Sequence, residues 1–289
     1  MTDARSWVTA AVGEGSVVVR SRRLPGATSS VVRALDVIGR RGTRHRLVLR
    51  SYEDREPQTV EPRAVEREVA ALAVAARTGL SVPEVVASDV EAGRVLMTRL
   101  PGRPTMSGGP DWLPRLAQTL LAADSVAAPS GMDSYEHWYA IDEGVPSWSR
   151  RDASWRRALE HLAAARLPQA PSRFIHRDFH PANVLWSRGR ITGVVDWVNG
   201  CRGPIEADIA ITRVNLALVA GAAAADAFLT ACGYEIAAGY DPVWDLTVAC
   251  SMTDPGSVLA LGVFGALLTV DSVCRTLDDV VARAVSNLR

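Results

Sequence analysis

The sequence contains no lysine, and all 32 of its basic residues are arginine. Any cation that contacts a bound phosphate must therefore be a guanidinium, which is always charged and can bind through two N–H groups. The 32 acidic residues bring the net charge to zero, which excludes a bulk electrostatic attraction to nucleic acid or to a membrane surface. The longest apolar run, residues 258–270, is interrupted by Gly262 and Gly265 and is shorter than the ~20 residues of a membrane helix. We expect a buried helix there.

Cysteine is scarce as well. Cys201, Cys232, Cys250 and Cys274 are widely spaced and form no Cys-x-x-Cys pair, so we expect free, buried thiols rather than disulfides or a zinc site. Residues 1–7 lack the apolar core of a secretory signal. Both features favour a cytoplasmic protein. At 289 residues, 48% of them hydrophobic, the chain is long enough for a sizeable core in one two-lobed domain or in two small ones.

The most informative stretch is residues 174–183, Phe-Ile-His-Arg-Asp-Phe-His-Pro-Ala-Asn, which Val-Asp-Trp follows at 195–197. Residues 184–186 and 191–195 are typical of two short strands joined by a turn. A hairpin closed there brings Asn183 close to Asp196, so that an amide oxygen and a carboxylate converge as ligands for a hard cation. Asp178 lies one loop earlier, free to accept a hydrogen bond from a hydroxyl. The three residues fit the needs of phosphoryl transfer, which are charge neutralisation, alignment and a proton acceptor.

A zinc site is the alternative interpretation of the same stretch. His176 and His180 are four residues apart, which is the spacing of a zinc pair on a helix. However, Pro181 follows at once and no Glu lies between the two histidines, which argues against a helical metal-hydrolase site.

The pattern His-x-Asp-x-x-x-x-Asn, followed by an Asp after a short hairpin, resembles the catalytic and metal loops of the protein-kinase-like superfamily. The form His-x-Asp-Phe-His-Pro-x-Asn with Asp-Trp is similar to its aminoglycoside phosphotransferase branch, and residues 193–210 are similar to uncharacterised bacterial members. The resemblance implies an α+β fold of two lobes. Residues 1–98 would form a small nucleotide-binding lobe with an antiparallel sheet and one helix. Residues 99–289 would form a larger, mainly helical lobe for catalysis and acceptor binding.

The resemblance also implies roles and cofactors. Asp178 would align the acceptor hydroxyl and take its proton, while Asn183 and Asp196 would bind Mg²⁺ at the phosphates of ATP. His176 and Asp208 would support the catalytic loop. We predict helices at residues 111–123, 154–165, 206–220, 222–230, 242–250 and 258–287 from apolar residues at helical spacing.

In the N-terminal third, residues 16–20 and 31–37 are predicted strands around a loop at 23–30. Such a loop offers backbone N–H groups, with the hydroxyls of Ser29 and Ser30, to phosphate oxygens. An ordinary hairpin turn is the alternative, because the loop has a single glycine and does not match Gly-x-x-x-x-Gly-Lys.

Residues 46–50 form the next predicted strand. The resemblance places Arg50 where the family carries the lysine that contacts the ATP phosphates; a solvated strand-end arginine is the alternative. A helix is predicted at residues 61–78, where Glu68 lies at the position of the family's partner for that cation. Glu66 is the second choice for this role.

The strand predicted at residues 94–98 leads into residues 99–102, which look like the linker that holds adenine between the lobes. We expect contacts from the Thr98 carbonyl and the Leu100 N–H. Residues 133–143 and 146–148 mix acids with aromatics, which fits a polycationic amino sugar as acceptor. A packed surface loop with an acidic rim fits these residues equally well.

The expectation is an ATP-dependent phosphotransferase that moves the γ-phosphate to a hydroxyl of a small molecule, first of all an aminoglycoside-type or other antibiotic. A metabolic kinase for choline, homoserine or a sugar amine is the second possibility. A nucleotide-binding pseudokinase is the third. We expect no nucleic-acid or membrane partner, and the oligomeric state is left open.

Overall fold

Alternating apolar residues build a sheet with two different faces. Leu35 and Val37 of β2, and Leu47 and Leu49 of β3, point to one face. The computed structural model describes residues 4–25, 30–52, 63–138, 144–164, 172–236, 239–260 and 267–288. Its largest sheet is antiparallel, with strand order β1-β2-β3-β5-β4. The strands are β1 (Val17–Arg23), β2 (Val31–Ile38), β3 (Arg44–Ser51), β4 (Val85–Asp89) and β5 (Arg94–Thr98).

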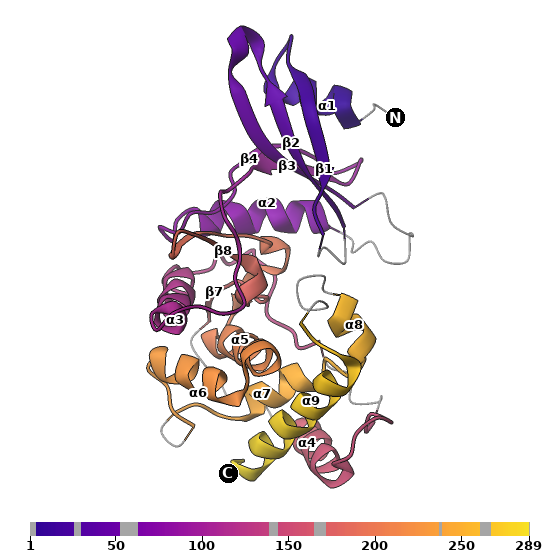
Figure 1. Cartoon of the computed structure of the whole chain (residues 1–289), viewed down its shortest axis with the longest axis vertical. Coiled ribbons are helices and arrows are strands. Elements are labelled where there is room, and N and C mark those ends of the chain that lie inside the picture. Colours follow the sequence, from indigo (N-terminus) through magenta and orange to yellow (C-terminus); the bar gives the residue numbers. More distant parts are fainter. Residues whose placement is uncertain are drawn as a thin grey trace.

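Two helices cover this sheet from opposite sides. Helix α1 (Ala4–Val12) packs Val8 against the face that carries Leu35 and Leu47. Helix α2 (Ala64–Ala75) shares its core with Val95 and Met97 of β5. Figure 1 shows α2 lying between the sheet and the rest of the chain. The second face of the sheet, which carries Arg50, therefore looks toward the remainder of the molecule.

The second part of the chain is mainly helical (Figure 1). Its helices are α3 (Trp112–Ala123), α4 (Asp152–Ala164), α5 (Ile205–Ala220), α6 (Ala222–Ala231), α7 (Val243–Ala249), α8 (Pro255–Ala260) and α9 (Val270–Ser286). Two small antiparallel sheets join them: β7 (Arg173–Ile175) with β10 (Cys201–Gly203), and β6 (Arg103–Pro104), β8 (Val184–Ser187) and β9 (Arg190–Val194) in the order β6-β8-β9. The α+β architecture with two lobes confirms the fold class expected from the sequence.

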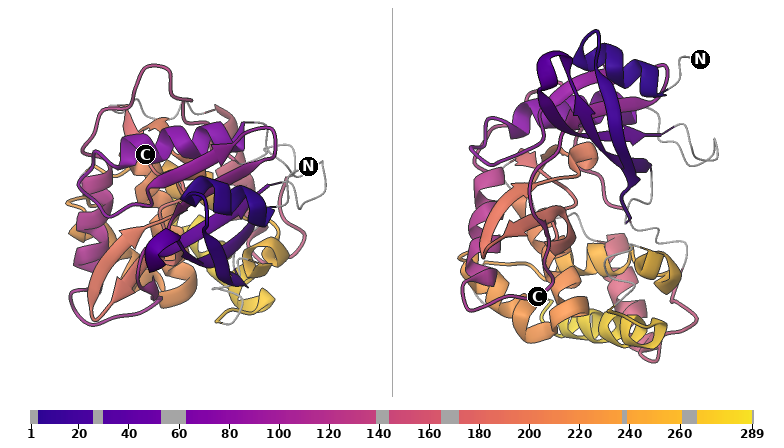
Figure 2. Two further views of the ribbon diagram at one scale, coloured as in Figure 1. Left: turned by 90° about the horizontal axis from the view of Figure 1, so that it is seen from above. Right: turned by 45° about the horizontal axis from the view of Figure 1, so that its top comes forward.

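The segment that follows β5 ties the large sheet to the hairpin of β8 and β9. Figures 1 and 2 show it running beside the hairpin before it enters α3. Gly102, at φ 105°, approaches the hairpin so closely that a Cβ would lie 2.4 Å from Thr192 Oγ1 and 2.8 Å from the Trp186 carbonyl oxygen. Thr192 Oγ1 in turn donates to the Pro101 carbonyl at 2.5 Å. The linker is thus fixed to the hairpin by both packing and hydrogen bonding.

The helix predicted over residues 258–287 is wrong as a single element. Helix α9 begins afresh after Thr269, whose hydroxyl accepts from the Ser272 N–H while the Ser272 hydroxyl accepts from the Thr269 N–H. This reciprocal cap satisfies N–H groups that a continuous helix would bond internally. Helix α1 and strand β4 are additional elements that the sequence did not predict.

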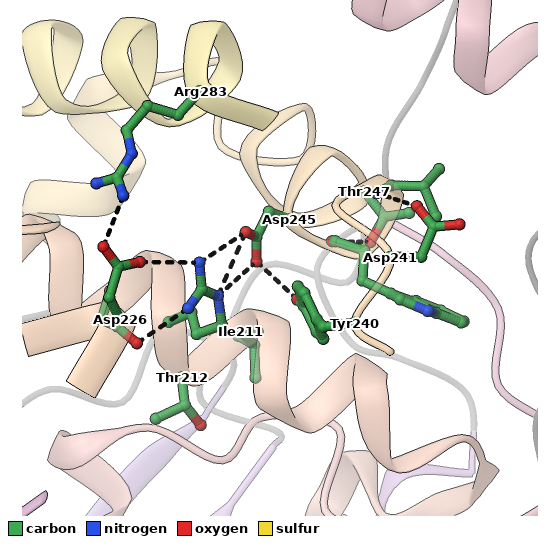
Figure 3. A network of polar contacts seen from close by, with 12 residues as sticks. Ile211, Thr212, Asp226, Tyr240, Asp241, Asp245, Thr247 and Arg283 are labelled. Atoms are coloured by element: carbon green, nitrogen blue, oxygen red, sulfur yellow. Dashed lines mark hydrogen bonds and ion pairs between the residues drawn. The ribbon is translucent and has the colours of Figure 1, made fainter. Parts of the chain in front are cut away.

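A buried arginine holds the helical part together (Figure 3). Arg213 of α5 donates to both carboxylate oxygens of Asp245 on α7 at 3.1–3.3 Å and to the Ala225 carbonyl of α6 at 3.0 Å. Asp226 of α6 bridges Arg213 and Arg283 of α9. The Tyr240 hydroxyl completes the group with a 2.7 Å bond to Asp245. One charge network therefore connects four helices.

The sequence also predicted free thiols and no membrane helix. All four cysteines are free, and Cys201, Cys232 and Cys250 are buried while Cys274 is half-buried. None of the helices in the described part of the chain combines the length and the apolar character that a membrane span requires.

Candidate active site

The loop that carries Asp178 follows β7 and is anchored from below by α5. The backbone N–H of His176 donates to Asp208 Oδ2 at 2.7 Å, and the His176 ring contacts the Val195 carbonyl through Nε2 at 3.0 Å. Both side chains are buried. Burial lowers the pKa of His176, which keeps the ring neutral at pH 7. Burial raises the pKa of Asp208 to about 7, against the opposing effect of the His176 and Arg177 N–H groups.

Asn183 is attached to Asp178 through its amide nitrogen. Nδ2 donates to the Asp178 carbonyl at 3.0 Å and lies 3.4 Å from Asp178 Oδ2. His180 Nε2 lies 3.4 Å from Asp178 Oδ1. Because the amide nitrogen faces Asp178, the Asn183 amide oxygen faces away from that carboxylate and is available as a ligand.

Asp196 comes to the same place from the far end of the hairpin. The Val195 N–H donates to the Asn183 carbonyl at 2.9 Å. The residue just before Asp196 is therefore hydrogen-bonded to the backbone of Asn183. Asp196 has left-handed backbone angles, φ 68° and ψ 58°, and precedes the short 3-10 helix Trp197–Asn199. This conformation is uncommon for a residue with a side chain. It re-aims the carboxylate as the strand ends.

Arg50 and Glu68 are in direct contact, as the resemblance implied. Arg50 Nη1 lies 2.9 Å from Glu68 Oε1 and 2.8 Å from Asp196 Oδ1, so one guanidinium joins β3, α2 and the hairpin. Glu66, the second choice, is exposed. Burial alone would lower the pKa of Arg50, but the carboxylates of Asp196 and Glu68 raise it well above its usual value. Arg50 conversely lowers the pKa of Asp196, although burial acts in the opposite direction.

The predicted nucleotide contacts are less sharply defined. Ser29 lies outside the described residues. Ser30 is buried at the start of β2, and its hydroxyl has no hydrogen-bond partner among the described residues. Thr98 ends β5, where its N–H donates to the Glu84 carbonyl at 2.9 Å. The Leu100 side chain packs on the hairpin, since a Cβ at Gly193 would lie 2.3 Å from Leu100 Cδ1. Thr98 and Leu100 thus mark the junction between the large sheet and the hairpin.

The acidic and aromatic segment expected near the acceptor is described for residues 133–138, while residues 139–143 lie outside the described part. Trp138 is 46% exposed, and the Arg177 guanidinium lies 4.3 Å from its ring centroid. Arg177 also donates to the Glu136 carbonyl. Tyr135 instead packs edge-on against Trp244 at 6.1 Å. The segment is therefore packed at Tyr135 and open at Trp138, beside the residue that precedes Asp178.

The donor set fits Mg²⁺ better than zinc. His176 uses Nε2 at the Val195 carbonyl, and its Nδ1 receives the Asp178 N–H at 3.3 Å, so its ring is fully engaged. Among the described residues, no three His, Cys, Asp or Glu side chains converge as metal ligands. An amide oxygen and a carboxylate oxygen, from Asn183 and Asp196, are instead the small set of hard ligands that Mg²⁺ accepts when phosphates and water complete its shell.

From the sequence, Tyr52 was given no role at the site, and His180 was considered only as half of a zinc pair. The Tyr52 hydroxyl donates to Glu68 Oε2 at 3.1 Å, and so holds the second carboxylate oxygen of the Arg50 pair. His180 contacts Asp178 and also accepts the Ala182 N–H through Nδ1 at 3.2 Å. The spacing of His180 in the motif was a signal from which its contact with Asp178 could have been predicted. Nothing in the sequence around Tyr52 indicated its contact with Glu68.

Comparisons with known proteins identify the family and the fold. The model of the phosphotransferase enzyme family (APH) matches residues 26–246. LicA in complex with AMP has a TM-score of 0.65 at 11% identity, covering 97% of this chain and 97% of that chain. A thermostable mutant of aminoglycoside phosphotransferase APH(4)-Ia, in a ternary complex with ADP and hygromycin B, has a TM-score of 0.64 at 17% identity, with 99% of each chain covered.

A choline/ethanolamine kinase family protein from Mesorhizobium loti has a TM-score of 0.56 at 17% identity, covering 92% of each chain. The comparison with curated proteins found no match. The identities are low, so these structures show a shared fold, while the family model spans most of the sequence. The resemblance noted in the motif is confirmed: the chain belongs to the phosphotransferase enzyme family and is a small-molecule phosphotransferase.

Proposed function

We propose that the protein transfers the γ-phosphate of ATP to a hydroxyl of a small molecule, with Asp178 as the proton acceptor. The observation that carries this proposal is the convergence of four side chains, three from residues 178–196 and one, Arg50, from a distant part of the sequence. Asn183 contacts Asp178 through its amide nitrogen, and Arg50 contacts Asp196 at 2.8 Å. The bonded pair Val195 and Asn183 connects the two halves of this group. A proton acceptor, two hard ligands and a fixed cation are what phosphoryl transfer requires.

The roles follow from the contacts. Asp178 aligns the acceptor hydroxyl and takes its proton as the new P–O bond forms and the bond to the ADP leaving group breaks. Arg50, held by Glu68, steadies the α and β phosphates, and Ser29 with Ser30 covers them. Asn183 and Asp196 would hold Mg²⁺, which would neutralise phosphate charge when bound. The AMP, ADP and AMP-PNP complexes among the structural neighbours support a nucleotide as donor.

We assign nucleotide binding to residues 1–98 and acceptor binding to residues 99–289. The division is placed where β5 ends at Thr98, because Arg103 and Pro104 already pair with the hairpin strand β8. The Thr98 carbonyl and the Leu100 N–H then face adenine at the joint between the two parts. His176 and Asp208 act from behind the loop by fixing its backbone.

The acceptor is an antibiotic sugar or related antibiotic as first choice. The complexes of neighbours with hygromycin B and with amicoumacin support this class. A metabolic amino alcohol such as choline is the second choice, supported by the choline/ethanolamine and ethanolamine kinases of the same fold. Trp138 offers an exposed ring for stacking in either case, and the Arg177 guanidinium lies 4.3 Å from the centroid of that ring. Ammonium groups of the acceptor would therefore bind away from Arg177.

A coupled ADP-release screen tests the proposal. The purified chain with Mg-ATP is assayed against aminoglycosides, macrolides, peptide antibiotics and small amino alcohols. We expect ADP release that depends on one acceptor class and stops in Asp178→Ala. ATP binding without any acceptor-dependent release across the panel would favour a pseudokinase instead.

A further inference from the structure

A second concave site lies apart from the proposed active site. A pocket of about 730 Å³ is formed by the linker after β5, the approach to α3 and the turn of the β8–β9 hairpin. Asn183 and Asp196 lie at the opposite end of this hairpin from its turn. The volume is within the range of small-molecule sites.

The pocket also lies on the opposite face of the small sheet from the one that we expect to face the nucleotide. Arg103 and Trp186 are paired across β6 and β8, and both line the pocket. Pro104 and Leu185 form the neighbouring pair and point to the other face, because side chains alternate along a strand. We therefore expect the face that carries Pro104 and Leu185, and not the face of the pocket, to be the one that faces the nucleotide.

Positive charge dominates the walls. Arg103, Arg115 and Arg188 line the pocket against a single acidic residue, Asp111. Arg115 pairs with Asp111 at 3.4 Å, whereas neither Arg103 nor Arg188 forms an ion pair within the described part of the chain. The pocket also contains the N-terminal end of α3, a 12-residue helix whose dipole favours an anion, although the Trp112 N–H already donates to the Gly109 carbonyl at 2.9 Å and Pro114 has no N–H.

Two indoles give the pocket an aromatic wall. Trp112 and Trp186 line it at 7% and 8% exposure, and the Nε1 atom of each is buried away from the pocket surface. Aromatic side chains beside guanidinium groups that form no ion pair within the described part of the chain favour a ligand with a ring and an anionic group.

We propose that this pocket binds a small molecule that carries a phosphate group on a flat ring. Arg103 and Arg188 hold the phosphate by charge-assisted hydrogen bonds, and the ring lies against Trp112 and Trp186. The site is separate from the phosphoryl-transfer centre, so its existence does not depend on the proposed function. Its wall at Gly102 is packed on Thr192 and is continuous with the linker between the two parts of the chain.

Phenyl phosphate is the probe, titrated into the full chain by calorimetry with phenol as the neutral comparison. We expect saturable binding of one equivalent of phenyl phosphate, no binding of phenol, and an unchanged affinity when Mg-AMP-PNP saturates the nucleotide site. The double variant Arg103→Ala/Arg188→Ala should bind at least about 10-fold more weakly, the loss of two charge-assisted contacts. Arg190→Ala is the matched control, since this exposed arginine lies beside the turn but does not line the pocket.

Gly109→Trp puts a large side chain on the lining of the pocket as a second variant. A Cβ at Gly109 meets nothing within 4 Å, so the melting temperature should stay close to that of the unmodified protein. Binding should weaken in this variant. The proposal is overturned if phenyl phosphate fails to saturate the unmodified chain, if Mg-AMP-PNP displaces it, if phenol binds equally well, or if the variants bind as the control does.

Discussion

Two residues of the proposed active site are held in an uncommon backbone conformation. Arg177 has φ 64° and Asp196 has φ 68°, and one precedes Asp178 while the other is itself a proposed metal ligand. Such a conformation costs on the order of 1–3 kcal/mol and persists where the surroundings fix it. Here Asp208 fixes the first loop through the His176 N–H, and Arg50 fixes Asp196. The strain therefore supports a functional interpretation of both loops.

Arg50 is the residue whose substitution bears most directly on nucleotide binding. Arg50→Ala should weaken Mg-AMP-PNP binding by roughly 1–3 kcal/mol, because a charge-assisted contact to phosphate is lost. Calorimetric titration measures this. Arg50→Lys keeps the charge and one donor nitrogen for the contacts that Nη1 alone makes with Glu68 and Asp196, but it loses the other guanidinium N–H groups that can bind phosphate. The Mg-AMP-PNP affinity of Arg50→Lys should lie between those of the unmodified protein and Arg50→Ala. Full affinity in Arg50→Ala would show that Arg50 of β3 does not contact the phosphates.

Asp124 should make stability fall as the pH rises. Burial raises the pKa of Asp124 to about 7, partly offset by Arg173. Between about pH 4 and pH 7 the folded carboxyl keeps a proton that the unfolded carboxyl has released, so the free energy of unfolding declines through this window. Asp124→Asn should make that decline shallower, leaving the part due to Asp208, and urea unfolding at about pH 5 and about pH 7 measures this against the unmodified protein. Equal pH dependence in both proteins would contradict the assignment.

At the scale of elements, helix α2 and the turn after Asp196 are packed without spare room. A Cβ at Gly200 would lie 2.8 Å from Ala71 Cβ on α2 and 3.2 Å from the Phe174 ring. The same helix carries Glu68, and the same turn begins at Asp196, so this contact sets the distance that Arg50 bridges. Close approach of two backbones is the physical reason for glycine here.

Gly200→Val should therefore disturb both stability and the site. We expect a loss of about 1–3 kcal/mol of unfolding free energy from overpacking, with weaker Mg-AMP-PNP binding because α2 moves away from Asp196. Gly131→Val is the control, since a Cβ there meets nothing within 4 Å. Chemical denaturation and calorimetry report the two effects. Normal nucleotide affinity in a destabilised Gly200→Val would contradict the idea that the contact between Gly200 and α2 positions the proposed site.

The motif elements were predictable from sequence because their signals are local. The hairpin of β8 and β9, strand β5 and helices α5 to α7 follow from apolar spacing and turn residues close to the expected bounds. Strand β4 was missed because Val85 and Val86 are followed by small and polar residues that carry little strand signal. The break before α9 was missed because its cap uses Ser272, rather than the usual Glu or Gln. The resemblance placed Glu68 ahead of Glu66, whereas the physical distinction between the two, burial, is a tertiary property.

At the scale of the molecule, the proposed site is built where the large sheet meets the helical part. Arg50 comes from the sheet, and Asp178, Asn183 and Asp196 come from the loops around the small hairpin. The linker is attached to that hairpin by Thr192 and by the packing of Leu100 on Gly193. Relative movement of the two parts would therefore alter the distance between Arg50, the proposed phosphate ligand, and Asp178, the proposed proton acceptor.

Asp178→Asn tests the account most directly, measured as acceptor-dependent ADP release together with Mg-AMP-PNP affinity. The amide keeps the shape and the contact with Asn183 but cannot take a proton from a hydroxyl. We expect release to fall by at least about 100-fold, the lower end of general-base effects, while the nucleotide affinity stays within about twofold. Unimpaired release by Asp178→Asn would contradict the proposed roles at this site.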